Sequence, residues 1–184
     1  MIKFLVSGLI NIETTLKIEG FPLNYNPVNY PFYGVHSNVS GVGYNVAKAL
    51  TVLGASVDFL SIIGDDDNGM IVDANLKQDK INSKYMQKLL RETCQSVIIY
   101  ENSGRRQIHV DLKELQETPY PEDLYKKAVA ENEVCLLCNI NFSRSMLAEA
   151  KKVGKLIATD VHALSSLDDE YNRDFGSCRY SFPQ

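Results

Sequence analysis

The first residues with chemical potential in this sequence are an amide and a carboxylate, two positions apart. Asn11 and Glu13 follow a short apolar run and the turn residues Ser7-Gly8. In an extended chain, residues i and i+2 point to the same side, so the two side chains share a face. A carboxylate accepts hydrogen bonds and an amide both donates and accepts, so together they can bind several ligand hydroxyls. Taken alone, the pair also fits an ordinary turn whose polar groups are satisfied within the protein.

A glycine-rich segment supplies a second candidate binding element. Ser40-Gly41-Val42-Gly43-Tyr44-Asn45 opens residues 42–53, whose apolar side chains recur at helical spacing. Glycines let the backbone approach a ligand closely, and the first N–H groups of a helix have no partner within it. Asn45 could add a side-chain contact from the first turn. The alternative is a glycine turn needed only for tight packing, whereas a dinucleotide-binding GxGxxG motif fits poorly because Val46 stands at its third glycine.

The third feature is an acidic turn, Gly64-Asp65-Asp66-Asp67-Asn68-Gly69. A calcium-binding EF-hand loop does not fit, because the glycine comes one place early and Leu76 stands where the final acid belongs. We expect a solvated turn that caps the helix following it.

Cysteine and histidine residues give only weak indications of a metal site. Cys135 and Cys138 have CxxC spacing but lie in a predicted strand, where residues three apart point to opposite faces. We expect reduced core cysteines, as in cytosolic proteins. His109 and Asp111 share a strand face without a third ligand, so we predict no metal. A hydrolase is also disfavoured, because the GxSxG motif is absent.

The order of the predicted elements indicates an α/β fold. Strands that alternate with helices of this length predict a mostly parallel sheet with helices on both faces. A hairpin is predicted around Asn102-Ser103-Gly104. Residues 20–35 mix proline with aromatic residues, which suits edge strands and loops, and the aromatic side chains could form a satellite cluster, a lid over a pocket or a dimer contact. Predicted strands span residues 2–6, 57–63, 96–100, 107–110, 134–138 and 156–160, and predicted helices span residues 42–53, 70–80, 121–132 and 143–153, the last with Ser143 as its N-cap.

Composition and charge exclude several classes of protein. The 184 residues are 45% hydrophobic and 23% charged, which is ordinary for one globular domain. A net charge of −4 does not indicate a nucleic-acid-binding surface. No stretch approaches the roughly 18 apolar residues of a membrane span, so we expect no membrane partner and a cytoplasmic location.

The three motifs, in this order and spacing, resemble the PfkB (ribokinase-like) carbohydrate kinase family across roughly residues 2 to 175. That family's pattern runs from a strand to Asn-x-Asp, a β lid, a Gly-Gly-x-x-x-Asn helix start and Gly-x-Asp-x-x-Gly. This sequence departs from the family's pattern at three positions, which bear on the identity of the substrate and not on the location of the site. Glu13 replaces the usual Asp, Ser40 stands at the first glycine, and Val42 replaces a frequent Lys.

The resemblance implies a ribokinase-like three-layer α/β/α fold with a mostly parallel sheet and a small β lid. Residues 1–184 would form a single incomplete domain without its C-terminal part, with lid segments at about 14–38 and 94–111. The ligand would be a sugar or nucleoside, and the lid could also form a homodimer. By this resemblance, the residues that contact substrate hydroxyls are Asn11, Glu13, Gly41, Gly43 and Asn45, and Asn141 or Asn139 would reach the same pocket.

The implied activity is ATP-dependent phosphoryl transfer to a substrate hydroxyl, with ATP and Mg²⁺ as cofactors of the full-length family member. The family's catalytic Asp lies in a Gly-Ala-Gly-Asp motif, which this sequence lacks, and no phosphate-binding GxxxxGK[ST] loop occurs either. We therefore assign no catalytic residue and expect a truncated N-terminal, substrate-binding part that is inactive alone. The alternative is a non-catalytic sugar- or nucleoside-binding or regulatory module.

Overall fold

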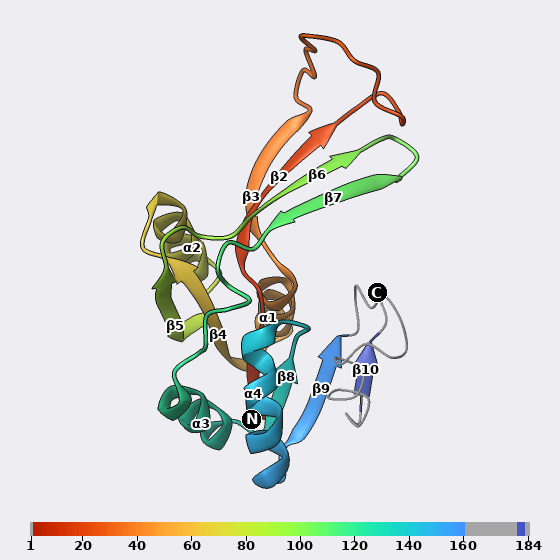
Figure 1. The fold of residues 1–184 in the computed structure, drawn as a ribbon. Helices are drawn as coiled ribbons and strands as arrows, with labels where there is room; N and C mark the ends of the chain where they lie inside the picture. The colour runs from red at the N-terminus through yellow and green to blue at the C-terminus, as the bar shows by residue number, and fades with distance from the viewer. Residues whose placement is uncertain (1, 161–179, 183–184) are drawn as a thin grey trace.

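The body of the protein is a parallel six-stranded sheet (Figure 1). The computed structural model describes residues 2–160 and 180–182. Neighbouring strands of this sheet run parallel in every pair. In sheet order the strands are β10 (Tyr180–Phe182), β9 (Leu156–Asp160), β8 (Val134–Leu137), β1 (Lys3–Ser7), β4 (Ser56–Gly64) and β5 (Asn82–Leu90).

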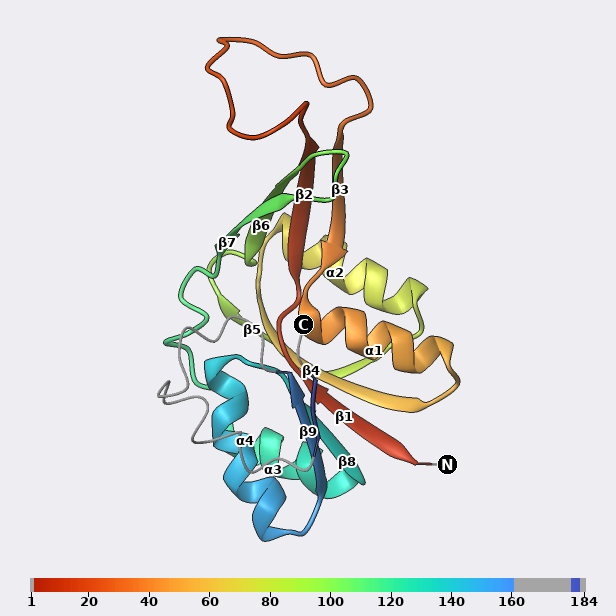
Figure 2. The same cartoon turned by 90° about the vertical axis from the view of Figure 1, so that its right-hand side faces the viewer.

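Helices cover both faces of this sheet. Successive side chains of its strands point to opposite sides, and apolar side chains are buried on both. On one face Val6 and Phe59 pack with α1 (Val42–Val52) and α2 (Asp67–Gln78). On the other face Leu5 and Leu60 pack with α3 (Glu122–Glu131) and α4 (Asn141–Lys152). Figure 2 shows the two helix pairs on opposite sides of the sheet. The predicted α/β architecture with helices on both faces is confirmed.

A second sheet of four strands extends from one end of the body (Figure 1). Its order is β3 (Val35–Ser40), β2 (Asn11–Lys17), β6 (Gln95–Tyr100) and β7 (Arg106–Asp111). The outer pairs are antiparallel, which confirms the predicted hairpin, and β2 runs parallel to β6 in the middle. The segments 14–38 and 94–111 supply most of this sheet, and Asn11 and Glu13 lie within β2 rather than in a turn before it.

One local prediction is corrected by the structure, and several strands were missed. Ser143 is not an N-cap, because α4 begins at Asn141 after Ile140 and the Ser143 hydroxyl instead hydrogen-bonds the Ser7 hydroxyl at 2.7 Å. Strands β2, β3, β5 and β10 were not among the predicted strands, and in β5 the buried positions follow no strict alternation. The other predicted helices and strands occur within a few residues of their expected bounds.

The predicted core cysteines are buried. Cys135 lies in β8 and Cys138 follows it, and both are free thiols. Cys178 and His162 lie outside the described residues.

Candidate functional site

The strand order of the large sheet reverses beside β1. From β1 the chain continues to β4 and β5 on one side, and it later returns to β8 and β9 on the other side. Open α/β sheets bind ligands at the carboxyl ends of the strands where such a reversal occurs. The segment after β1 and the segment after β8 meet there, because the Cys138 N–H donates to the Ser7 carbonyl at 2.8 Å. The structure therefore places the sequence-predicted residues at the expected edge.

Glycines allow α1 to begin directly against the segment that leaves β1. A Cβ atom on Gly43 would lie 2.6 Å from the backbone carbon of Gly8, and one on Gly41 would lie 2.5 Å from the Leu9 carbonyl oxygen. Gly41 also has a φ of 113°, which side-chain-bearing residues rarely adopt. The Tyr44 N–H donates to the Leu9 carbonyl at 3.2 Å. Packing alone thus requires these glycines, and it places the start of α1 against the segment that leads from β1 into β2.

At this edge of the sheet, Asn11 has a buried polar atom that a ligand could satisfy. Its side chain is only 2% exposed, and its amide nitrogen donates to the Ser96 hydroxyl at 2.9 Å. Its amide oxygen is buried and has no hydrogen-bond partner among the described residues. Leaving a buried acceptor unpaired costs about 1–3 kcal/mol. A hydroxyl donated by a ligand would satisfy this oxygen.

The other predicted residues surround Asn11 to different degrees. Glu13 is partly buried. It lies on the same face of β2 as Asn11, because one residue separates them along the strand. Asn45 is exposed in the first turn of α1, with its amide nitrogen 3.5 Å from the hydroxyl of Ser40, the residue paired with Asn11. The structure thus brings together Asn11, Glu13, Gly41, Gly43 and Asn45.

Asn141 lies at the same edge of the sheet, but its hydrogen bonds are to Gln116 and not to the residues around Asn11. It is exposed at the start of α4, where its amide nitrogen donates to the Gln116 carbonyl at 2.9 Å and its backbone N–H donates to the Gln116 side chain at 3.1 Å. The alternative candidate, Asn139, donates its backbone N–H to the Asp160 carboxylate at 3.3 Å. Substrate contact by either residue stays a prediction.

Two further polar residues at this edge, Ser96 and Asp160, were not among the site residues predicted from the sequence. Ser96 holds the Asn11 amide, and only its position in the predicted hairpin hinted at a role. Asp160 is the buried last residue of β9, so an acid at a strand end was the available signal. Burial and the neighbouring Asp160 carboxylate raise the pKa of the Cys138 thiol well above its ordinary value. Cys138 is therefore a poor candidate for a nucleophile.

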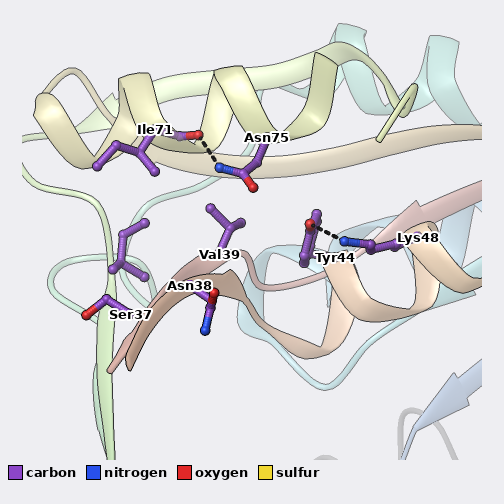
Figure 3. Close-up of a pocket in the computed structure, with 8 residues that line it drawn as sticks. Ser37, Asn38, Val39, Tyr44, Lys48, Ile71 and Asn75 are labelled. Atoms are coloured by element: carbon purple, nitrogen blue, oxygen red, sulfur yellow. Dashed lines mark hydrogen bonds between the residues drawn. The ribbon is translucent and has the colours of Figure 1, made fainter. Parts of the chain in front are cut away.

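A separate pocket of about 430 Å³ lies behind the second sheet (Figure 3). It is lined by side chains of β3, α1 and α2 and by Ile12, which points to the face of β2 opposite Asn11 and Glu13. Several of its polar side chains have partners: Asn75 donates to the Ile71 carbonyl, Lys48 contacts Tyr44, and Ser37 bonds Thr14. The unpartnered amide oxygen of Asn11 therefore distinguishes the strand-end site from this pocket.

The residues that the structure describes do not form a metal centre. No group of at least three His, Cys, Asp or Glu side chains among residues 2–160 and 180–182 is arranged to hold a metal ion. Within the same part of the chain, no helix is both long enough and apolar enough to cross a membrane.

A parallel α/β sheet with a polar site at its strand-order reversal, and a small second sheet beside that site, together define the ribokinase-like fold. Residues 1–174 match the family described as pfkB family carbohydrate kinase, and the chain belongs to this family.

Individual relatives agree with this assignment. The chain is 26% identical over 157 residues to a bifunctional ribokinase/ribose-5-phosphate isomerase A of Fructilactobacillus sanfranciscensis, covering 84% of this chain and 29% of that protein. Its fold matches a microbiome-derived acarbose kinase with a TM-score of 0.86 at 21% identity, covering 99% of this chain and 60% of that one. It also matches Arabidopsis thaliana ribokinase complexed with ribose and ATP, with a TM-score of 0.76 at 18% identity, covering 90% and 55%. The chain thus spans less than two thirds of each of these proteins.

Proposed function

We propose that this chain is the substrate-binding part of an ATP-dependent sugar or nucleoside kinase. The observation that carries the proposal is the buried, unpartnered amide oxygen of Asn11 at the strand-order reversal. Membership of the pfkB family and the likeness to a ribokinase that holds ribose and ATP support it. The proposed ligand is a small polyhydroxylated molecule such as ribose or a nucleoside.

Each part of the site has a proposed role. Asn11 and Glu13 accept hydrogen bonds from ligand hydroxyls, and the backbone at Gly41 and Gly43 donates to ligand oxygens. Asn45 adds a side-chain contact. The second sheet acts as a lid over the ligand, formed mainly by residues 14–38 and 94–111. Exposed aromatic side chains between β2 and β3, such as Tyr25 and Tyr33, offer apolar surface for a homodimer through that lid.

Phosphoryl transfer needs groups that residues 1–184 do not contain. The sequence has neither a Gly-Ala-Gly-Asp motif nor a GxxxxGK[ST] loop. A nucleotide and its metal ion must be positioned for transfer to the acceptor hydroxyl. We therefore propose that the 184-residue chain by itself binds substrate without phosphorylating it. Formation of ADP in the presence of ribose and MgATP by the purified chain would contradict this part of the proposal.

Calorimetric titration of the 184-residue chain with ribose and inosine tests the binding part. We expect saturable binding of at least one of them, weakened about tenfold or more in Asn11→Ala, because a buried amide that contacts the ligand is lost. Asn75→Ala is the matched control, since it removes the same side chain from the pocket behind the second sheet. Equal affinities in the two variants, or no binding by the wild-type chain, would refute the proposed site.

A further inference from the structure

The acidic turn before α2 makes a contact that the sequence did not indicate. Asp66 caps α2 by accepting the Gly69 N–H at 2.9 Å, as the turn motif predicts. Its carboxylate also accepts the Thr93 N–H at 3.0 Å and the Thr93 hydroxyl at 2.6 Å. The Thr93 hydroxyl in turn accepts the Gly64 N–H at 3.1 Å. Thr93 is fully buried, so the end of β4 and the start of α2 hold it from two directions.

The residues that directly follow Thr93 are hydrogen-bonded to the β2 residues of the candidate site. The next residue, Cys94, accepts the Ile12 N–H through its carbonyl at 3.1 Å, between Asn11 and Glu13. Two residues further on, the Ser96 hydroxyl accepts the Asn11 amide N–H at 2.9 Å. Hydrogen bonds therefore tie the body to Thr93 through Asp66, and the chain that follows Thr93 is in turn hydrogen-bonded to Asn11 and Ile12 of β2.

Close packing prevents this junction from sliding. A Cβ atom on Gly64 would lie 2.4 Å from the Thr93 nitrogen, so the chain before β6 lies directly on the end of β4. The buried Cys94 side chain donates to the Leu112 carbonyl at 3.1 Å, just after β7. The start of β6 and the end of β7 thus contact each other next to Thr93, the residue that Asp66 binds.

We propose that Asp66 and Thr93 are positioning residues that anchor the root of the second sheet and thereby fix Asn11 and Glu13 opposite the start of α1. This inference rests on the proposed function, because it assigns the pair a role in ligand affinity. Neither residue contacts the ligand. Losing the anchor loosens β2 and β6 together at the site while leaving the body sheet intact.

Amide hydrogen exchange of the unliganded chain tests the anchor without any substrate. In Thr93→Val, which keeps the shape and removes the hydroxyl, and in Asp66→Asn, we expect the Ile12 N–H to exchange about fivefold faster or more, from the loss of roughly one hydrogen bond. Amides within the β1–β4 ladder should accelerate less than Ile12, and by no more than the measured loss of unfolding free energy accounts for. Thr93→Ser, which keeps the hydroxyl, and Asp65→Asn, at a neighbouring side chain that is 82% exposed, should both resemble wild type. A rise at Ile12 no larger than the rise at the β1–β4 amides, or no rise at Ile12, would overturn the proposal.

The same variants are then titrated with ribose and inosine. We expect Thr93→Val and Asp66→Asn to bind about fivefold more weakly, with affinity restored in Thr93→Ser. Faster exchange at Ile12 with unchanged affinity would overturn the positioning role. If the wild-type chain binds neither ligand, the proposed function fails, and the exchange result alone decides whether the anchor exists. If Asp66→Asn does not fold, the comparison of Thr93→Val with Thr93→Ser carries the test.

Discussion

The start of α1 packs so closely on the segment after β1 that one methyl group is expected to displace it. The Cβ of an alanine at position 43 would lie 2.6 Å from backbone atoms of Gly8, which cannot rotate away. We predict that Gly43→Ala lowers the free energy of unfolding by about 1–3 kcal/mol, as overpacking does elsewhere.

Urea denaturation followed by circular dichroism measures this loss. Val52→Ala is the control, because it introduces alanine into the same helix at a side chain that is 79% exposed. Its effect should stay within about 0.5 kcal/mol. Equal stability of Gly43→Ala and wild type would show that α1 does not pack as the structure has it.

At the residue scale, local spacing made part of the site predictable. The i, i+2 spacing of Asn11 and Glu13 and the glycines before a helical pattern are visible within a few positions of sequence. No local spacing identifies Ser96 or Thr93. The partner of Ser96 is Asn11, 85 positions away, and the partner of Thr93 is Asp66, 27 positions away. Asp66 itself was assigned to the solvated capping turn, and only the fold shows that its carboxylate also holds Thr93.

The capping turn of α2 is expected to make stability depend on pH. Burial by itself raises the pKa of the Asp66 carboxyl group, but hydrogen bonds from the Thr93 hydroxyl and N–H and from the Gly69 N–H outweigh it. These bonds hold the pKa below its ordinary value of 3.8. A carboxyl group whose pKa is lower in the folded state stabilises the protein above its unfolded pKa, and this stabilisation is lost as the pH falls through the folded pKa.

We therefore predict that Asp66→Asn is less stable than wild type by about 1 kcal/mol at pH 7, because charge-assisted hydrogen bonds become neutral ones. The difference should shrink as the pH falls below about 4. Urea unfolding at pH 7, 5 and 3 measures it, with Asp65→Asn as the control at the exposed neighbouring carboxylate. A stability difference that is the same at all three values would contradict the assigned role of the charge.

Strand β5, which the sequence did not reveal, is held to β4 by a buried carboxylate. Asp58 is 1% exposed and accepts hydrogen bonds from Asn82 at 2.7 Å and Asn132 at 3.0 Å, and its carboxylate lies 3.0 Å from the Lys84 ammonium. We predict that Asp58→Ala costs about 3 kcal/mol of unfolding free energy, because Asn82 loses its acceptor and the buried network that also joins Asn132 and Lys84 is broken.

Thermal and urea unfolding check this loss, with the exposed Asp123 on α3 as the control substitution to alanine. Ligand affinity should not change in Asp58→Ala where the chain stays folded, because Asp58 lies near the amino end of β4 and the candidate site lies at the carboxyl ends. A loss below about 1 kcal/mol would mean that the buried carboxylate does not hold β5 in place.

At the element scale, periodicity located the amphipathic helices and the strands with a continuous apolar run. It failed where tertiary contacts decide. Ser143 has the right residue type for an N-cap, but its hydroxyl bonds Ser7, which is 136 positions away. Strand β5 lies at the edge of the sheet, where Lys84 and Lys88 occupy positions that a central strand would give to apolar residues.

At the scale of the whole molecule, the alternation of strands and helices predicted the parallel sheet but not the placement of the second sheet. Strand order decides that placement, because β2 leaves the carboxyl end of β1 and pairs with β6, which arrives from β5. The two sheets therefore meet where the strand order of the body reverses. Asn11 and Glu13 lie at this junction, on the face of β2 opposite the pocket behind the second sheet.

Chemical-shift mapping by NMR tests most directly which face of β2 binds the ligand. Ribose or inosine is titrated into the ¹⁵N-labelled 184-residue chain up to millimolar concentration. The proposed site predicts that the largest amide shifts occur at residues 8–13 and 41–45, around Asn11 and Gly43. Shifts confined to Ile71, Asn75 and their neighbours, or none at all, would contradict it.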